Sequence, residues 1–107
     1  MSRDDSWLAD MLSHAKLARD AVTEVTCEQF EENIEKRAAV THFVMIIGEA
    51  AAQVSEERRS ELTELPWRQI VATRNKIVHH YFKVDPRIIW DIVQNDLPVL
   101  ISALEAE

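Results

Sequence analysis

Glycine, proline and cysteine are scarce in this chain. Its 107 residues include one glycine, three prolines and one cysteine. So few turn-forming residues argue against a sheet protein, whose strands need frequent tight turns. The single cysteine, Cys27, has no partner for an internal disulfide, and no cysteines and histidines fall at zinc-site spacing. These absences predict a helical protein of a reducing compartment, which we expect to be cytoplasmic.

Long apolar runs are also missing. No run approaches the roughly 20 residues that a membrane-spanning helix needs, and no signal-peptide pattern opens the chain, so we expect no membrane partner. Apolar residues make up 47% of the chain and charged residues 29%, a balance typical of globular proteins. The length suffices for one modest core, which predicts a single domain over residues 1–107.

Apolar residues recur at helical spacing along most of the chain. Ser6 can cap a first helix that ends near Thr23. Thr26 and Gln29 form a capping-box sequence, which predicts the start of a long second helix that runs to about Val54.

The apolar stripe of this second helix includes Ile34. Gly48 lies in the middle of the helix, where glycine costs about 1 kcal/mol relative to alanine, and it therefore predicts a close approach of another helix.

The second half of the chain predicts two further helices. Residues 55–65 are polar and aperiodic, which indicates a loop. Pro66 suits the first turn of a third helix that ends near Phe82. Asp85-Pro86 is a cap followed by a first-turn proline and opens a fourth helix, which Pro98 should kink or restart. The four apolar stripes must bury one another, so we predict an all-α, up-and-down four-helix bundle with a short extra helix.

The basic charge is concentrated in one segment. The net charge is −7, which argues at first against a nucleic-acid partner. Residues 67–87, however, carry five lysines and arginines against the single Asp85, a local charge of +4, and the remainder carries −11. The candidates for contact with a polyanion in this segment are Arg68, Lys76 and Lys83.

The sequence RNKIVHHY, residues 74–81, places polar groups on an apolar helix face. On a helical wheel Arg74 lies in the middle of the apolar stripe of the third helix. Burying an uncompensated charge costs several kcal/mol, so Arg74 needs a partner. It either forms a salt bridge with Glu49 of the second helix, or faces a groove or a second subunit where it meets a phosphate.

The side chains of Asn75, His79 and Tyr81 extend this arc of the wheel. Their chemistry favours a phosphate as the partner of Arg74. Arg74 can pair with phosphate oxygens two at a time, His79 can exchange a proton near neutral pH, Asn75 can orient either group, and Tyr81 offers a hydroxyl. No paired carboxylates adjoin them, which argues against a two-metal nuclease. Metal-free attack of an RNA 2′-hydroxyl on the adjacent phosphate needs only His79 as acid or base and Arg74 to stabilise charge.

One helix alone aims these groups poorly. Arg74 and His79 are five residues apart, about 140° around the helix. Two copies of the third helix across a twofold axis would bring both groups into one cleft. We therefore expect a homodimer that forms through this helix.

The chain resembles HEPN-domain proteins in this region. Arg74, His79 and Tyr81 match the R-x4-H-x-Y signature, and Asn75 is in the common position after the arginine. The blocks IIGEAA, LPWRQIVATRNKIVHHYFKVDP and IIWDIVQNDLP are similar to the HepT branch, toxins paired with a minimal nucleotidyltransferase antitoxin. The resemblance implies an all-α HEPN bundle, a dimer through the motif face, metal-independent RNase activity without a cofactor, and silencing by transfer of AMP to Tyr81.

Two other hypotheses about the function remain. The chain could be a non-catalytic HEPN module that binds a nucleotide or RNA and organises a dimer, or a structural bundle with an internal Arg74–Glu49 pair. Trp67, Tyr81 and Phe82 could stack on bases, although Trp67 is expected to pack in the bundle. Cys27 precedes the first turn of a helix, where its thiol is expected to be somewhat acidified, yet without a base nearby we interpret it as structural.

Overall fold

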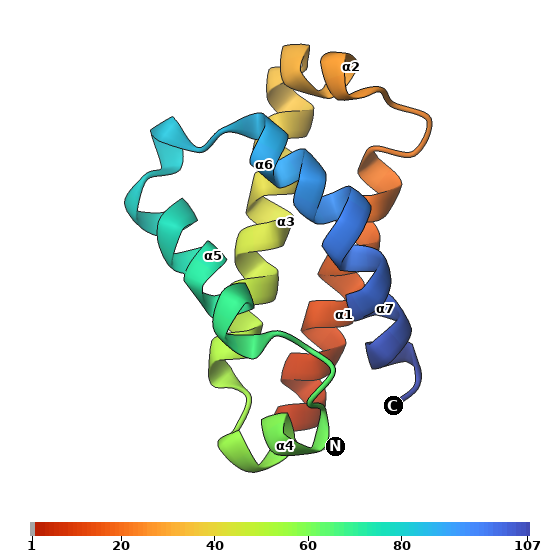
Figure 1. Ribbon diagram of the computed structural model, residues 1–107, viewed down its shortest axis with the longest axis vertical. Coiled ribbons are helices and arrows are strands. Elements are labelled where there is room, and N and C mark those ends of the chain that lie inside the picture. Colours follow the sequence, from red (N-terminus) through yellow and green to blue (C-terminus); the bar gives the residue numbers. More distant parts are fainter. Residues whose placement is uncertain (1) are drawn as a thin grey trace.

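The regular structure of this protein is entirely helical over residues 2–107, the part that the computed structural model describes (Figure 1). This confirms the prediction of an all-α fold. The elements are α1 (Arg3–Ala21), α2 (Cys27–Glu32), α3 (Ile34–Gln53), α4 (Glu56–Glu61), α5 (Trp67–His79), the 3₁₀ turn η1 (Tyr81–Lys83), α6 (Pro86–Asp91), the π-helical segment η2 (Ile92–Asp96) and α7 (Leu97–Glu105).

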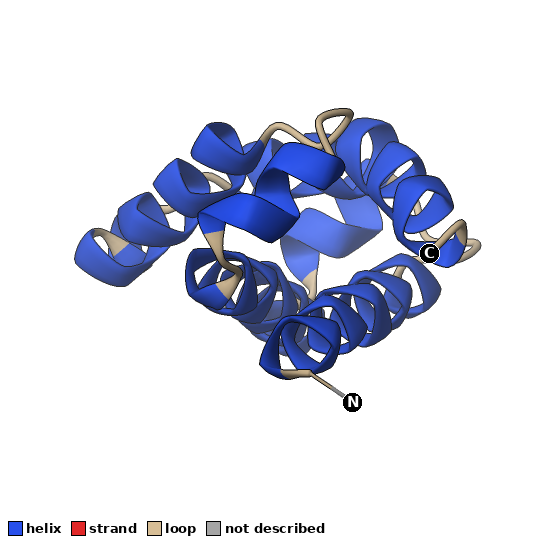
Figure 2. Ribbon diagram, turned by 90° about the horizontal axis from the view of Figure 1, so that it is seen from below, coloured by secondary structure: helices blue, strands red, loops and turns tan. Residues whose placement is uncertain are grey.

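Four long segments run alternately up and down. α1, α3, α5 and the continuous α6–η2–α7 segment follow one another in this order, and both ends of the chain lie at the same end of the bundle (Figures 1 and 2). α3 is central, with α1 on one side and α5 on the other, while α7 packs against α1. The helices meet in a core that includes Met11, Phe30, Val40, Ile77 and Ile89.

α5 lies at the edge of the bundle and packs mainly against α3 (Figure 2). Only Trp67 and Ile77 of this helix are buried. Most of its remaining surface is therefore open to solvent or to a partner. None of the helices within residues 2–107 is both long and apolar enough to cross a membrane.

The start of the first helix differs from the prediction. Ser2, rather than Ser6, is its N-cap, because the Ser2 hydroxyl accepts a hydrogen bond from Asp5 N at 3.1 Å. The amide of Ser6 already donates to Ser2 O, so Ser6 lies inside the helix. Both serines suit a cap by residue type, and the earlier one begins the helix.

The predicted second helix is two helices. The capping box at Thr26 and Gln29 is present, as predicted. The helix then ends at Glu32, because Asn33 is extended (φ −97°, ψ 97°) and its side-chain oxygen accepts from Lys36 N at 3.0 Å to cap α3. A short amide side chain competes in this way with the helical backbone bonds. Ile34, which we expected on the buried stripe, is 71% exposed.

The loop predicted over residues 55–65 contains a short helix, α4. Ser55 caps it by accepting from Arg58 N at 3.2 Å. Its first turn is acidic and its last turn basic, which stabilises a helix through its dipole. α4 has no buried residue, and its sequence therefore lacks the apolar period that predicts a helix.

Near the motif, α5 ends earlier than predicted, and the predicted fourth helix begins where we expected it. α5 ends at His79 instead of near Phe82, since His80 leaves helical geometry (φ −132°, ψ 34°). Asp85 caps α6 through a 2.9 Å bond from Arg87 N, as predicted. Pro98 lies in the first turn of α7, and the helix passes through the π-helical segment just before it, which agrees with the expected distortion.

Candidate functional site

Gly48 brings α3 and α5 together next to Arg74. A Cβ atom built on Gly48 would lie 2.2 Å from Arg74 Cβ and 3.1 Å from Ile70 O. Any larger residue would push the two helices apart. The expected close helix approach is therefore confirmed, and it occurs at the arginine of the motif.

Arg74 is held by carboxylate and amide oxygens on two sides. Its Nε and Nη2 atoms each lie 2.7 Å from Glu49 Oε1 on α3, and its Nη1 donates to Asn75 Oδ1 at 2.6 Å. The side chains of Arg74 and Glu49 are 30% and 39% exposed, so this salt bridge is at the surface edge of the α3–α5 contact. A guanidinium has five N–H groups, and three contacts leave two of them for another acceptor.

His79 and Asn75 lie on an exposed face of α5. His79 is the last residue of the helix and is exposed, as is Asn75 one turn earlier. Within the described residues of this single chain, no hydrogen bond joins His79 to Arg74 or Asn75. This fits the expected separation of about 140° on one helix.

Tyr81 does not continue the face of Arg74. The wheel placed it above Arg74 by extending the helix, and that placement is wrong because α5 ends at His79 and Tyr81 belongs to the 3₁₀ turn η1. Tyr81 is 44% exposed and lines a cavity together with Arg37 and Thr41 of α3. Its ring meets Phe82 edge-on, with centroids 5.7 Å apart.

The basic candidates are all accessible. Arg68, Lys76 and Lys83 are exposed, and across residues 2–107 none of the three is within 4.0 Å of a carboxylate. Arg87, in contrast, is 2.6 Å from Glu31 and joins α6 to α2. The three candidates therefore keep their charge available for a polyanion.

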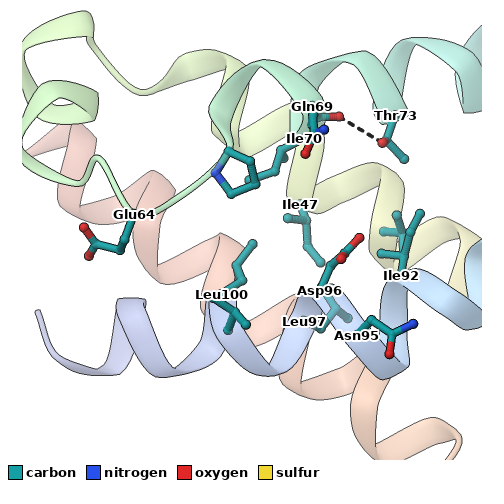
Figure 3. A pocket seen from close by; sticks show the side chains of 13 residues that line it. Ile47, Glu64, Gln69, Ile70, Thr73, Ile92, Asn95, Asp96, Leu97 and Leu100 are labelled. Atoms are coloured by element: carbon teal, nitrogen blue, oxygen red, sulfur yellow. Dashed lines mark hydrogen bonds between the residues drawn. The ribbon is translucent and has the colours of Figure 1, made fainter.

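A second concavity lies away from the motif. This groove of about 300 Å³ lies between α3, α5, η2 and α7 and has an apolar lining that includes Ile47, Ile70 and Leu100 (Figure 3). Glu64 and Asp96 contribute carboxylates to it, and no lysine or arginine lines it. The groove therefore does not suit a phosphate.

The structure also shows the surroundings of Trp67 and Cys27, two residues for which the sequence predicts a structural role. Trp67 is buried and its Nε1 donates to Leu62 O at 2.9 Å, so it packs in the bundle as expected. The thiol of Cys27 is partly buried and lies 3.6 Å from Glu31 Oε1. Burial and this carboxylate raise the pKa of Cys27, and the expectation of an acidified thiol is wrong. In the part of the chain described, no three histidine, cysteine or acidic side chains gather as metal ligands would.

Comparison with known proteins identifies the family. The family described as "Ribonuclease HepT-like" matches residues 11–107. The chain belongs to this HepT-like family. This match confirms the resemblance to the HepT branch that the motif blocks indicate. The matched residues include all of α5, which carries the motif, and all of α3, which α5 contacts.

Individual relatives cover nearly the whole chain. "Putative RNase MJ0127" of Methanocaldococcus jannaschii is 32% identical over 94% of this chain and 83% of its own length. "Putative RNase MJ1380" of the same organism is 31% identical over 98% of both chains. "Probable ribonuclease HepT" of Thermococcus cleftensis is 31% identical over 92% of this chain and 90% of its own length. No solved structure matches this chain.

Proposed function

We propose that this HepT-like protein is the toxin of a toxin–antitoxin module and acts as a metal-independent endoribonuclease. The observation that carries the proposal is the Arg74 guanidinium, fixed by Glu49 and Asn75 with N–H groups still free, in the same exposed helix as His79. Family membership and the names of the relatives support RNA as the substrate.

The chemistry is an internal transfer of the phosphoryl group. The 2′-oxygen of one ribose attacks the adjacent phosphorus, and the bond to the 5′-oxygen of the next nucleotide breaks. One proton leaves the 2′-hydroxyl and one is added to the 5′-oxygen, and His79 acts as acid or base in this exchange. Arg74 stabilises the charge that develops on the phosphate oxygens. The products are a 2′,3′-cyclic phosphate and a 5′-hydroxyl.

The complete site requires two chains. α5 is at the edge of the bundle, and Val78, between Arg74 and His79 in the sequence, is 46% exposed. A twofold axis along this face would place Arg74 of each chain near His79 of the partner. The homodimer forms through α5, and Asn75 supports the arginine within it.

The charge distribution suits this placement despite the acidic total. Arg68, Lys76 and Lys83 surround the motif on α5 and η1, and the excess of acidic residues lies outside residues 67–87. A local basic field is sufficient to attract the RNA backbone to one face. The acidic remainder restricts RNA to that face.

Regulation occurs at Tyr81. Tyr81 is 44% exposed on the 3₁₀ turn that follows α5, so a second protein can reach this residue. The partner is a minimal nucleotidyltransferase antitoxin, which transfers AMP to this oxygen in the cytoplasm.

Analysis of the cleaved ends tests the reaction. An RNA incubated with the purified protein in excess chelator should give fragments that end in 2′,3′-cyclic phosphate, and the same sequence with 2′-deoxyribose should stay intact. Activity that disappears with chelator and returns with magnesium would contradict the metal-free mechanism.

One observation favours a second candidate, a non-catalytic module that binds RNA or a nucleotide and dimerises. Glu49 already neutralises Arg74, and within the described residues no hydrogen bond joins His79 to Arg74, so the motif could serve binding alone. Such a module would bind the RNA and leave it uncleaved in the same assay.

A further inference from the structure

Phe82 is an aromatic side chain presented fully to solvent next to the motif. It is 99% exposed, more than the six other large apolar side chains that are exposed within residues 2–107. The turn that carries it is ordered by a 2.8 Å bond from Lys83 N to His80 O. The edge-on contact with Tyr81, at an interplanar angle of 89°, leaves a face of the Phe82 ring accessible.

A cavity opens beside this ring. Its volume is about 360 Å³, within the range of small-ligand sites. Its walls are α3 on one side and the segment from η1 to α6 on the other, and its lining residues are Ile34, Arg37, Ala38, Thr41, Tyr81, Phe82, Val84 and Pro86. We refer to it as the Phe82 cavity.

The lining combines two kinds of group. Aromatic and aliphatic residues line the cavity together with Arg37, which carries a guanidinium, and with Thr41 and Tyr81, which carry hydroxyls. In the described structure Arg37 donates to Glu31 O at 2.6 Å and has no carboxylate within 4.0 Å, so its charge is not neutralised by a side chain. Flat apolar faces with a few donors at the edge are what a nucleobase needs.

The cavity is also close to the proposed chemistry. Phe82 follows His79 by three residues, so their Cα atoms are at most about 11 Å apart. Lys83, exposed on the same turn, adds a cation beside the ring. A nucleotide bound here would therefore lie close in space to His79.

We propose that Phe82 and the Phe82 cavity bind an unpaired base of the RNA substrate, stacked on the phenyl ring beside the scissile phosphate. This inference rests on the proposed ribonuclease function and specifies its substrate class as single-stranded RNA. A base inside a duplex has both faces covered by its neighbours and cannot stack on a side chain. The ring therefore selects unpaired strands, and Arg37 and the hydroxyls meet the edge of the base.

Binding of a strand that cannot be cleaved separates this inference from catalysis. The probe is a fluorescent single-stranded 2′-O-methyl RNA, followed by anisotropy, with the duplex of the same sequence as comparison. Phe82→Leu keeps an apolar side chain and removes the ring, Phe82→Trp keeps an aromatic face, and Leu17→Ala changes an apolar residue of similar type on α1 that is 48% exposed. Phe82 is outside the core, so none of these changes should affect folding.

We expect Phe82→Leu to weaken binding of the single strand about 5- to 150-fold, the range that loss of one stacked base produces. Phe82→Trp and Leu17→Ala should bind like the parent, and the duplex should bind weakly to every variant. On cleavable RNA, Phe82→Leu should raise KM and keep kcat.

The results distinguish the two proposals. Equal binding by Phe82→Leu and the parent overturns the base site, as does a change in oligomeric state of Phe82→Leu by light scattering, which would assign the ring to a subunit contact. A parent that binds the single strand through Phe82 and leaves the cleavable RNA intact overturns the ribonuclease function alone.

Discussion

Glu49 holds Arg74 from the neighbouring helix, with one carboxylate oxygen 2.7 Å from two of the guanidinium nitrogens. Gly48, the residue before Glu49, permits the close helix approach that this contact needs. Two consecutive residues of α3 therefore fix the position of the motif arginine. The pair is partly exposed, and such pairs contribute only about 0–1 kcal/mol to stability. Its main effect is to orient the guanidinium.

Substitution of Glu49 should reduce cleavage far more than stability. We expect Glu49→Ala to lower kcat about 10- to 100-fold, since misplacing a catalytic group by about 1 Å has an effect of that size, while the free energy of unfolding falls by no more than about 1 kcal/mol. Glu49→Gln, which keeps an acceptor oxygen, should recover part of the activity. Cleavage kinetics and urea unfolding measure the two effects. A large loss of stability with unchanged kcat would make the pair structural.

Removal of either proposed catalytic side chain should abolish cleavage and leave the fold intact. His79 is exposed and Arg74 is outside the core, so alanine at either position removes no core packing. We expect cleavage of RNA and growth inhibition to fall below detection for both variants, with circular dichroism unchanged. His80→Ala is the matched control, because this neighbouring histidine lies outside the motif signature. Cleavage by His79→Ala at the parental rate would exclude His79 as acid or base.

The proposed dimer should depend on Val78. This side chain is 46% exposed on α5, and a glutamate there would place a charge in the proposed interface. Burying an unpaired charge costs several kcal/mol, so Val78→Glu should sediment as a monomer at concentrations where the parent is a dimer. Leu17→Glu introduces the same charge at a residue of similar exposure, 48%, on α1, and should leave the dimer unchanged. Equally tight dimers for parent and Val78→Glu would locate the interface elsewhere.

Asp4 should make stability depend on acid pH. Its carboxylate accepts from the hydroxyl of Ser55 at 2.7 Å and from the Ser55 amide at 3.0 Å, joining the start of α1 to the start of α4. These bonds lower the pKa of Asp4 below its usual 3.8. A carboxyl group whose pKa is lower in the folded state than in the unfolded state stabilises the fold at pH values above 3.8. This stabilisation is lost as the pH falls through the pKa of the folded state. Asp4→Ala should therefore lower Tm at pH 7, and the difference should narrow below pH 3.8. A Tm difference independent of pH would contradict the assignment.

The features of the fold that were predicted correctly are those set by residues close to one another in the sequence. The capping box at Thr26, the start at Asp85-Pro86 and the close approach at Gly48 each follow from local chemistry, and the structure contains all three. The break at Asn33 was missed because Ile34 continues the apolar period and hides the cap. α4 was missed because it contributes nothing to the core.

The part of the candidate site that lies on α5 was also predictable, because its residues are close to one another in the sequence. Arg74 and Asn75 share one helix, and Glu49 is one of the two partners that the sequence predicts for Arg74. The position of Tyr81 was not predictable from a helical wheel, because the backbone of His80 leaves the helix and no glycine or proline signals the change. The cavity beside Phe82 combines residues of α3 with residues of η1 that are at least 40 positions away in the sequence, and it has no sequence pattern of its own.

Tyr81 is the predicted switch, and its observed position changes how the switch would operate. Tyr81 lines the Phe82 cavity and lies on the 3₁₀ turn η1, which does not continue the helical face of Arg74. AMP attached there would bring its phosphate beside Arg37 and its adenine onto the apolar wall, two residues beyond His79. The added charge and bulk would then exclude RNA from the whole region. Incubation with the nucleotidyltransferase and ATP should add the mass of AMP to the parent and stop its cleavage, while Tyr81→Phe should gain no mass and stay active. Arg37→Ala should still accept AMP, because the oxygen that reacts is unchanged. Silencing of a Tyr81→Phe protein by the same treatment would place the switch at another residue.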